Sequence, residues 1–124
     1  PSYIKQNYIT EILELLKNKL VNNKIKWEDI EITIEVNPGT VTKEKLEAYK
    51  VSGINRLSIG LQSTNDKLLK QIGRIHTYNE TLNTYNVAKE IEFNNINVDL
   101  MIALPNQTIR RYKRKFRKNS RVRT

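Results

Sequence analysis

Residues 56–63 alternate strictly between apolar and polar side chains, and this stretch constrains the fold more than any other. One set of alternate positions, here called the apolar parity, holds Leu57, Ile59 and Leu61. The other set, the polar parity, holds Arg56, Ser58, Gly60 and Gln62. A period of two residues over this length predicts a β-strand with one apolar face. Residues 31–36 and 96–101 follow the same design. Helical patterns separate the three stretches, so the sequence predicts an α/β fold with three parallel strands and flanking helices.

The polar parity of these predicted strands is unusual for a parallel sheet. A parallel strand that is buried on both faces carries apolar residues on both. Here the polar positions are Thr33, Glu35, Ser58, Gly60, Gln62, Asn97 and Asp99. One interpretation is that these faces are solvated or belong to edge strands. The other is a barrel-like sheet, whose apolar parity packs on outer helices while the polar parity surrounds a ligand at the carboxyl ends of the strands.

Helical segments with recognisable ends surround the predicted strands. An amphipathic helix is expected over residues 3–20, with apolar residues Ile4, Tyr8, Ile12, Leu15, Leu16 and Leu20 at helical spacing. Further helices are expected to begin after Thr42, Asn65 and Thr77, and Glu80 completes a capping box with Thr77. The resulting αβαβααβ series cannot close a barrel with its three strands. Either a small open sheet stands alone or the sequence is part of a larger sheet.

The basic character of the chain is confined to its end. The formal net charge is +9, but nine of the 22 Lys and Arg residues lie in residues 110–124, which contain no acid. Residues 1–109 are therefore balanced, with 13 basic and 13 acidic residues. The sequence predicts a core at 1–109 and a basic tail at 110–124, which is either disordered or the product of a shifted reading frame. An arm that binds nucleic acid through phosphate contacts has this composition, so a small basic nucleic-acid-binding protein is the alternative function.

The composition also bears on the classes of site that the chain can hold. The chain contains no Cys, which excludes disulfides and Cys-ligated metal sites, and its single His76 cannot form a zinc site alone. His76 is expected in a loop, as a hydrogen-bonded residue. No apolar run approaches membrane-spanning length, so a cytoplasmic protein without a membrane segment is expected. No glycine-rich loop at a helix start supports a phosphate-binding barrel.

Four side chains stand out as a candidate site. Glu35 and Gln62 end two predicted strands, Asp99 lies on the inward parity of the third, and Arg74 follows in the loop beyond the central strand. A parallel sheet brings these positions to one mouth. Arg binds a carboxylate through two parallel hydrogen bonds, and carboxylates accept from an amine or from ribose hydroxyls, so a zwitterionic ligand with hydroxyls suits the set. The alternative is that Arg74 only pairs with one of the carboxylates.

Several separated motifs resemble one known family in order and spacing. They are Glu-Ile-Thr-Ile-Glu-Val-Asn-Pro-Gly-Thr-Val-Thr at 31–42, Gly-Ile-Asn-Arg-Leu-Ser-Ile-Gly-Leu-Gln-Ser at 53–63, Gly-Arg-Ile-His-Thr at 73–77 and Asn-Ile-Asn-Val-Asp-Leu-Met at 95–101. They resemble the radical S-adenosylmethionine (SAM) proteins of the oxygen-independent coproporphyrinogen III oxidase-like (heme chaperone) family. The resemblance covers about residues 1–108. It implies that the chain is a fragment of a partial TIM barrel, the radical SAM core.

The resemblance also implies a ligand set and a function. Glu35, Gln62, Arg74 and Asp99 match family positions that contact SAM. The full-length family uses SAM with a 4Fe-4S cluster held by three cysteines, and its members act on coproporphyrinogen or bind heme. This chain lacks those cysteines and carries Ala103 where the family usually has Gly. The chain alone is therefore expected to be inactive, and specific binding of nucleic acid is not expected.

Overall fold

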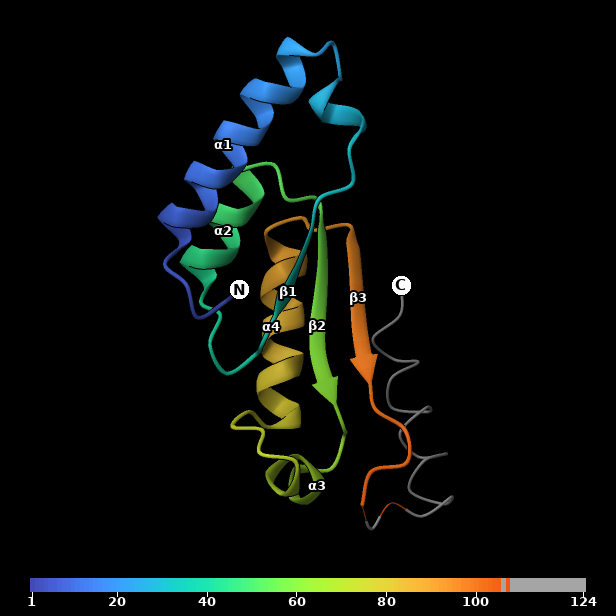
Figure 1. Ribbon diagram of the computed structural model, residues 1–124. Helices are drawn as coiled ribbons and strands as arrows, with labels where there is room; N and C mark the ends of the chain where they lie inside the picture. The colour runs from blue at the N-terminus through green and yellow to red at the C-terminus, as the bar shows by residue number, and fades with distance from the viewer. Residues whose placement is uncertain (106, 108–124) are drawn as a thin grey trace.

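Three parallel strands form the sheet of this computed structural model, which describes residues 1–105 and 107. The strands lie in the order β1-β2-β3, with β1 at Thr33–Val36, β2 at Arg56–Gln62 and β3 at Asn95–Leu100. The helices are α1 (Gln6–Asn22), a short 3-10 helix η1 (Trp27–Asp29), α2 (Lys43–Val51), α3 (Asp66–Gln71) and α4 (Tyr78–Glu90). The predicted αβαβααβ series is therefore confirmed (Figure 1). The predicted tail at 110–124 lies outside the described residues.

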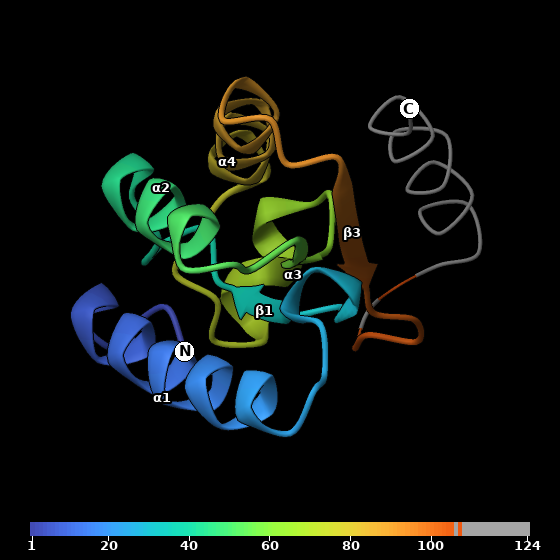
Figure 2. The same cartoon turned by 90° about the horizontal axis from the view of Figure 1, so that it is seen from above.

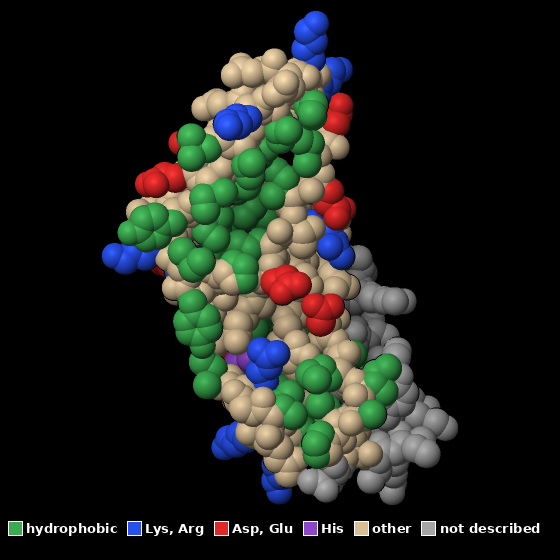
Figure 3. Space-filling model, viewed as in Figure 1, with side chains coloured by type: hydrophobic (Ala, Val, Ile, Leu, Met, Phe, Trp, Pro, Cys, Tyr) green, Lys and Arg blue, Asp and Glu red, His purple; other side chains and the backbone are tan. Residues whose placement is uncertain are grey.

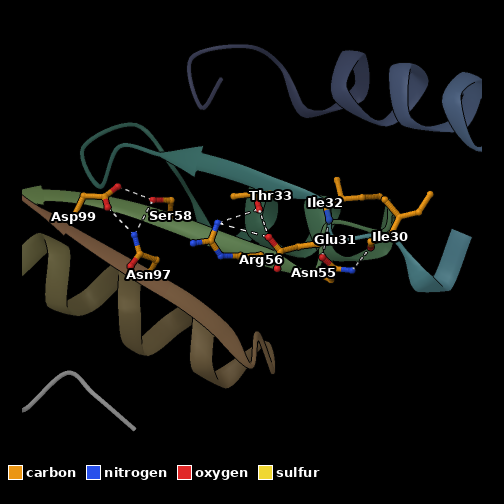
Figure 4. A network of polar contacts seen from close by, with 9 residues as sticks. All are labelled: Ile30, Glu31, Ile32, Thr33, Asn55, Arg56, Ser58, Asn97 and Asp99. Carbon is orange, nitrogen blue, oxygen red and sulfur yellow. Dashed lines mark hydrogen bonds and ion pairs between the residues drawn. The ribbon is translucent and has the colours of Figure 1, made fainter.

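The first strand is shorter than predicted, because a side chain replaces part of its backbone pairing. The amide side chain of Asn55 accepts the backbone N–H of Ile32 at 2.8 Å and donates to the carbonyl of Ile30 at 2.8 Å. Figure 4 shows Asn55 bridging these two residues at the start of the sheet. The regular pairing of β1 with β2 begins only at Thr33, which faces Arg56. The prediction of a strand from residue 31 is wrong by two positions for this reason.

The apolar parity of the central strand forms the core, as the sequence predicts. Leu57 and Ile59 are fully buried, and Leu61 is 1% exposed. The helical side of the sheet supplies Leu46 and Tyr49 from α2, which are also buried. Figure 2 shows α1, α2 and α4 in a curved row on one side of the strands. The opposite face of the sheet carries the polar parity, and this arrangement is what positions the site.

Helix α1 begins three residues later than predicted and ends two residues later, and the apolar residues predicted for it are mostly exposed. Only Leu13 of this helix is buried, and Leu20 is partly buried against the core. The exposed members of the predicted set are Ile4, Tyr8, Ile12, Leu15 and Leu16. Figure 3 shows hydrophobic side chains gathered along this helix. The helix packs on α2 and η1 through one side, so a period of 3.6 residues identified the helix without identifying the side that is covered.

The predicted helix starts are confirmed at three side-chain caps. Thr42 accepts the backbone N–H of Lys45, and Asn65 accepts those of Lys67 and Leu68. Thr77 and Glu80 form a reciprocal capping box at the start of α4. Each cap satisfies backbone donors that the first turn of a helix leaves unpaired, so the helix starts are defined by local chemistry.

The capping box of α4 gives this fold a pH-dependent contribution to stability. The Glu80 carboxylate accepts the backbone N–H of Thr77 at 2.6 Å and its hydroxyl at 2.9 Å, and these bonds lower the pKa of Glu80. A carboxyl group whose pKa is lower in the folded than in the unfolded state stabilises the fold at pH values above its unfolded pKa. That contribution is lost as the pH falls. We expect wild type to be more stable than Glu80→Gln near neutral pH. The difference should begin to shrink near pH 4.3, the ordinary value for Glu, and should vanish only as the pH falls below the lowered pKa of the folded state. Urea denaturation across this range measures the difference, and a gap that is independent of pH would contradict the prediction.

Candidate functional site

All four predicted site residues line one cleft at the carboxyl ends of the strands. Glu35, Gln62, Arg74 and Asp99 surround a volume of 410 Å³. Ser58 and Gly60 of β2 form part of its lining, as do residues 1–3. Figure 3 faces this side of the molecule, where acidic and basic side chains lie close together below the hydrophobic area of α1. The polar parity therefore points into a shared cleft and not only into solvent.

Neutral donors from two strands hold the Asp99 carboxylate. The hydroxyl of Ser58 donates to Asp99 Oδ2 at 2.6 Å, and the side-chain amide of Asn97 donates to Asp99 Oδ1 at 2.6 Å. Figure 4 shows the three side chains pointing toward one another across β2 and β3. Both donors fix the orientation of the carboxylate and leave its negative charge without a neutralising cation. Each oxygen retains acceptor capacity for a ligand.

The charges of the cleft are not cancelled within the described part of the chain. The ion pairs there join Lys50 to Glu92 and Arg56 to Glu31. Neither pair includes Glu35, Arg74 or Asp99. Over residues 1–105 and 107, the alternative that Arg74 only pairs with a carboxylate of the protein is therefore not supported. The cleft presents two carboxylates and one guanidinium to whatever enters it.

Gln62 reaches the cleft through an irregular end of β2. The pairing of β2 with β3 shifts register between Gly60 and Gln62, and Gln62 has a φ of 65°, in the left-handed region. The N–H of Ser63 donates to the carbonyl of Leu61 at 2.8 Å, which closes a three-residue γ-turn around Gln62. A Cβ atom at Gly60 would lie 3.1 Å from Gln62 Nε2, so the glycine leaves room for this amide. Such strained conformations occur most often at binding and catalytic sites.

The end of α3 determines where Arg74 lies. Gly73 has a φ of 74°, its N–H donates to the carbonyl of Lys70, and the N–H of Arg74 donates to the carbonyl of Leu69 at 2.9 Å. This pair of bonds is the Schellman motif, in which a residue with positive φ, usually Gly, ends a helix and turns the chain. The motif places Arg74 directly beyond the helix end, on the lining of the cleft.

Ser2 also contributes to the cleft, a role that was not predicted from the sequence. This residue is 2% exposed, its hydroxyl lies 2.6 Å from that of Thr40, and it accepts the backbone N–H of Asn37 at 3.2 Å. Lys45 also donates its ammonium to the carbonyl of Ser2. These bonds fix residues 1–3 against the end of β1, where they form one wall of the cleft. A single Ser near the start of the chain carries no sequence pattern that would have identified this role.

Thiolate ligands are absent from the sequence, and the part of the chain that the structure describes shows no metal site. There is no Cys anywhere in the sequence, and the described residues hold no group of three or more His, Asp or Glu side chains placed to bind a metal ion. Thiolates are the ligands of iron–sulfur clusters, so this chain cannot hold one by itself.

No helix of the described region is both long and apolar enough to cross a membrane.

Comparisons with known proteins agree with this geometry. A family model described as "Radical SAM superfamily" matches residues 4–117, which extends past residue 108, where the resemblance seen in the sequence motifs ends. The chain is 47% identical to the heme chaperone HemW of Haemophilus influenzae over 92 residues, covering 73% of this chain and 24% of that protein. It is 34% identical to HemW of Bacillus subtilis over 110 residues, covering 89% of this chain and 28% of that protein.

A solved structure gives the same picture of the fold. The coproporphyrinogen III oxidase HemN from Escherichia coli, described as a radical SAM enzyme, superposes with a TM-score of 0.82 at 27% identity. The superposition covers 99% of this chain and 27% of that one. The chain thus spans about a quarter of the length of the relatives that it matches. The expectation of an α/β unit from a radical SAM barrel is confirmed.

Proposed function

This chain belongs to the radical SAM superfamily, and from that premise we propose that its cleft binds S-adenosylmethionine. The observation that carries the proposal is the convergence of Glu35, Gln62, Arg74 and Asp99 on one cleft, with charges that no described side chain neutralises. SAM carries a carboxylate, an ammonium group, ribose hydroxyls and a sulfonium cation. A site with one guanidinium, one amide and two carboxylates offers a complementary group to each of these.

The chemistry of each side chain suggests its role. The planar guanidinium of Arg74 suits the carboxylate of the ligand, because it offers two parallel donors. Glu35 and Asp99 are acceptors, suited to the ammonium group and to ribose hydroxyls. The Gln62 amide can both donate and accept, which suits a polar edge of the ligand. Ser58 and Asn97 hold Asp99 in place for this contact.

We further propose that this chain serves as the SAM-binding part of a protein that handles heme or a porphyrin. Support comes from the relatives, which are heme chaperones and a coproporphyrinogen III oxidase. A 4Fe-4S cluster would supply the electron for reductive cleavage of a C–S bond of SAM, and this chain offers no thiolate to hold such a cluster. The chain alone therefore binds SAM without cleaving it.

The direct test compares SAM with 5′-methylthioadenosine, which lacks the amino and carboxyl groups and has a neutral thioether in place of the sulfonium cation. Charge-assisted bonds to those groups predict that the full chain binds SAM about tenfold or more tightly, as measured by equilibrium dialysis. Equal affinity for the two ligands would overturn the proposal. Asp99→Asn should lower the affinity for SAM and leave the stability of the fold nearly unchanged, because the amide can still meet Ser58 and Asn97.

A second expectation concerns the cluster. Anaerobic incubation of the full chain with iron and sulfide should leave no stoichiometric iron–sulfur cluster after desalting. Iron analysis and an assay for 5′-deoxyadenosine measure the two outcomes. Because the chain lacks every thiolate ligand, a stoichiometric cluster or turnover of SAM would contradict the prediction.

A further inference from the structure

We infer that His76 is a positioning residue, which holds the γ-turn of Gln62 and the end of β1 in place around the cleft. His76 is 2% exposed and lies two residues after Arg74. It does not line the cleft itself, so its effect on a ligand would pass through the residues it bonds. The inference rests on the proposed SAM site for its effect on binding, but its structural part can be tested without any ligand.

The imidazole ring spans the ends of two strands. Its Nδ1 lies 3.1 Å from Asn37 Oδ1, directly after β1, and its Nε2 lies 3.3 Å from the carbonyl oxygen of Leu61, near the end of β2. Asn37 Oδ1 also accepts the backbone N–H of Gly39 at 3.1 Å, which identifies this atom as the acceptor oxygen. Each ring nitrogen therefore faces an oxygen that only accepts. The tautomer of the ring decides which of these nitrogens donates.

The bond to Leu61 acts on the strained turn that presents Gln62. The Leu61 carbonyl accepts the N–H of Ser63 in the γ-turn, and the imidazole is its second donor. On the other side of the turn, the Gln62 carbonyl accepts the N–H of Met101 at 3.0 Å. A backbone conformation of this kind persists only where the surrounding structure determines it. His76 supplies one of the few side-chain bonds that can do so.

The same ring connects three parts of the cleft wall. Through Asn37 it contacts the segment after Glu35, through Leu61 it contacts the residue before Gln62, and through its own backbone it belongs to the loop of Arg74. Two of the four proposed ligand contacts, Glu35 and Gln62, thus lie next to residues that this buried side chain bonds. A residue that only filled space would not need both ring nitrogens directed at strand ends.

Two conservative variants separate the two bonds. Asparagine places its amide near the position of Nδ1, and glutamine places its amide near the position of Nε2. We expect His76→Gln to keep the Leu61 bond and to bind SAM within about threefold of wild type, whereas His76→Asn and His76→Ala should lose about tenfold. All measurements use the full chain, with equilibrium dialysis for affinity.

The structural readout needs no ligand. Amide hydrogen exchange at Ser63 and Met101, measured by NMR, should quicken in His76→Asn and His76→Ala and stay near wild type in His76→Gln. Thr81→Ala is the control, because it removes a buried hydroxyl that bonds the Thr77 carbonyl, and neither residue lines the cleft or bonds Leu61 or Asn37. It should lower stability without selectively exposing those two amides.

The outcomes distinguish this inference from the proposed function. If wild type fails to bind SAM but the exchange pattern holds, the proposed function fails and the positioning role stands. If His76→Gln and His76→Asn behave alike in exchange, or if Thr81→Ala gives the same pattern, the positioning role is overturned. A variant that unfolds is recognised by loss of amide dispersion throughout, and the remaining variants then decide the question through the same comparison.

Discussion

Replacing Arg74 with alanine is expected to weaken SAM binding by about ten- to a hundredfold, because hydrogen bonds to charged groups contribute about 1.5–3 kcal/mol. Arg74 lines the cleft and has no ion pair within the described residues, so its guanidinium is available to the ligand carboxylate. Arg74→Lys should recover only part of the loss, since an ammonium group lacks the two parallel donors. Equilibrium dialysis measures both variants.

Arg56→Ala provides the matched control for this change. Arg56 begins the same strand that ends at Gln62, and it contacts Glu31 and Thr33 at the opposite end of the sheet. Its removal changes the net charge of the protein by the same amount and should leave SAM affinity nearly unchanged. In Arg74→Ala, the preference for SAM over 5′-methylthioadenosine should shrink, because the ligand carboxylate loses its partner while Glu35 and Asp99 still face the ammonium group. A similar loss in both arginine variants would indicate a general charge effect and contradict the assigned role.

The strand residues that line the cleft could be predicted from the sequence because the side-chain period of a strand is two residues. Once residues 56–63 are a strand with Leu57 and Ile59 in the core, Ser58, Gly60 and Gln62 must face the other way. Parallel pairing then places Glu35 and Asp99 at the same end of the sheet as Gln62. The observed cleft contains all four predicted residues, although their contact with SAM stays a prediction.

Two parts of the site could not be predicted from local pattern. The bonds of Ser2 to Asn37 and Thr40 join residues that are far apart in sequence, and periodicity carries no information about such contacts. The γ-turn at Gln62 places a non-glycine residue at positive φ, which local preferences disfavour. Both exceptions lie on the cleft, where the requirements of a binding site can outweigh local preference.

Ala103 illustrates how a departure in sequence acquires a physical meaning. The sequence motif resembles a family that usually has Gly at this position, and Ala103 has a φ of 56° in the structure. Glycine adopts this region without the steric penalty that a Cβ atom introduces. Ala103 therefore adopts a backbone conformation that glycine adopts more readily, at the position where the resembling family usually has Gly.

The helix α1 shows where a correct secondary-structure prediction gives no tertiary information. Its period identified a helix, but five of its six predicted apolar side chains are exposed, and burial falls on Leu13. Which side of a helix is covered depends on its neighbours. In the described region these are α2 and η1, on one side only.

The largest effect on stability is expected from Leu57→Ala. Leu57 is 0% exposed at the centre of the middle strand, where it pairs with Ile34 on one side and Ile96 on the other. Removing a fully buried Leu side chain costs about 2–5 kcal/mol, because apolar contact is lost and the cavity closes only partly. Domains of this size are stable by about 5–15 kcal/mol. The outer edges of β1 and β3 are unpaired among the described residues. We therefore expect the free energy of unfolding of this chain to lie at the lower end of that range.

Urea denaturation followed by circular dichroism measures this effect, with Val51→Ala as the control. Val51 ends α2 and is 89% exposed, so removing its two methyl groups should change stability by less than about 0.5 kcal/mol. Leu57→Ala should lower the urea midpoint strongly or leave no cooperative transition. The reason is that the mutation removes a large share of a small free energy of unfolding. Equal midpoints for the two variants would mean that the β2 core does not determine the stability of this chain. The sheet described here would then not be the cooperative unit that holds the cleft residues together.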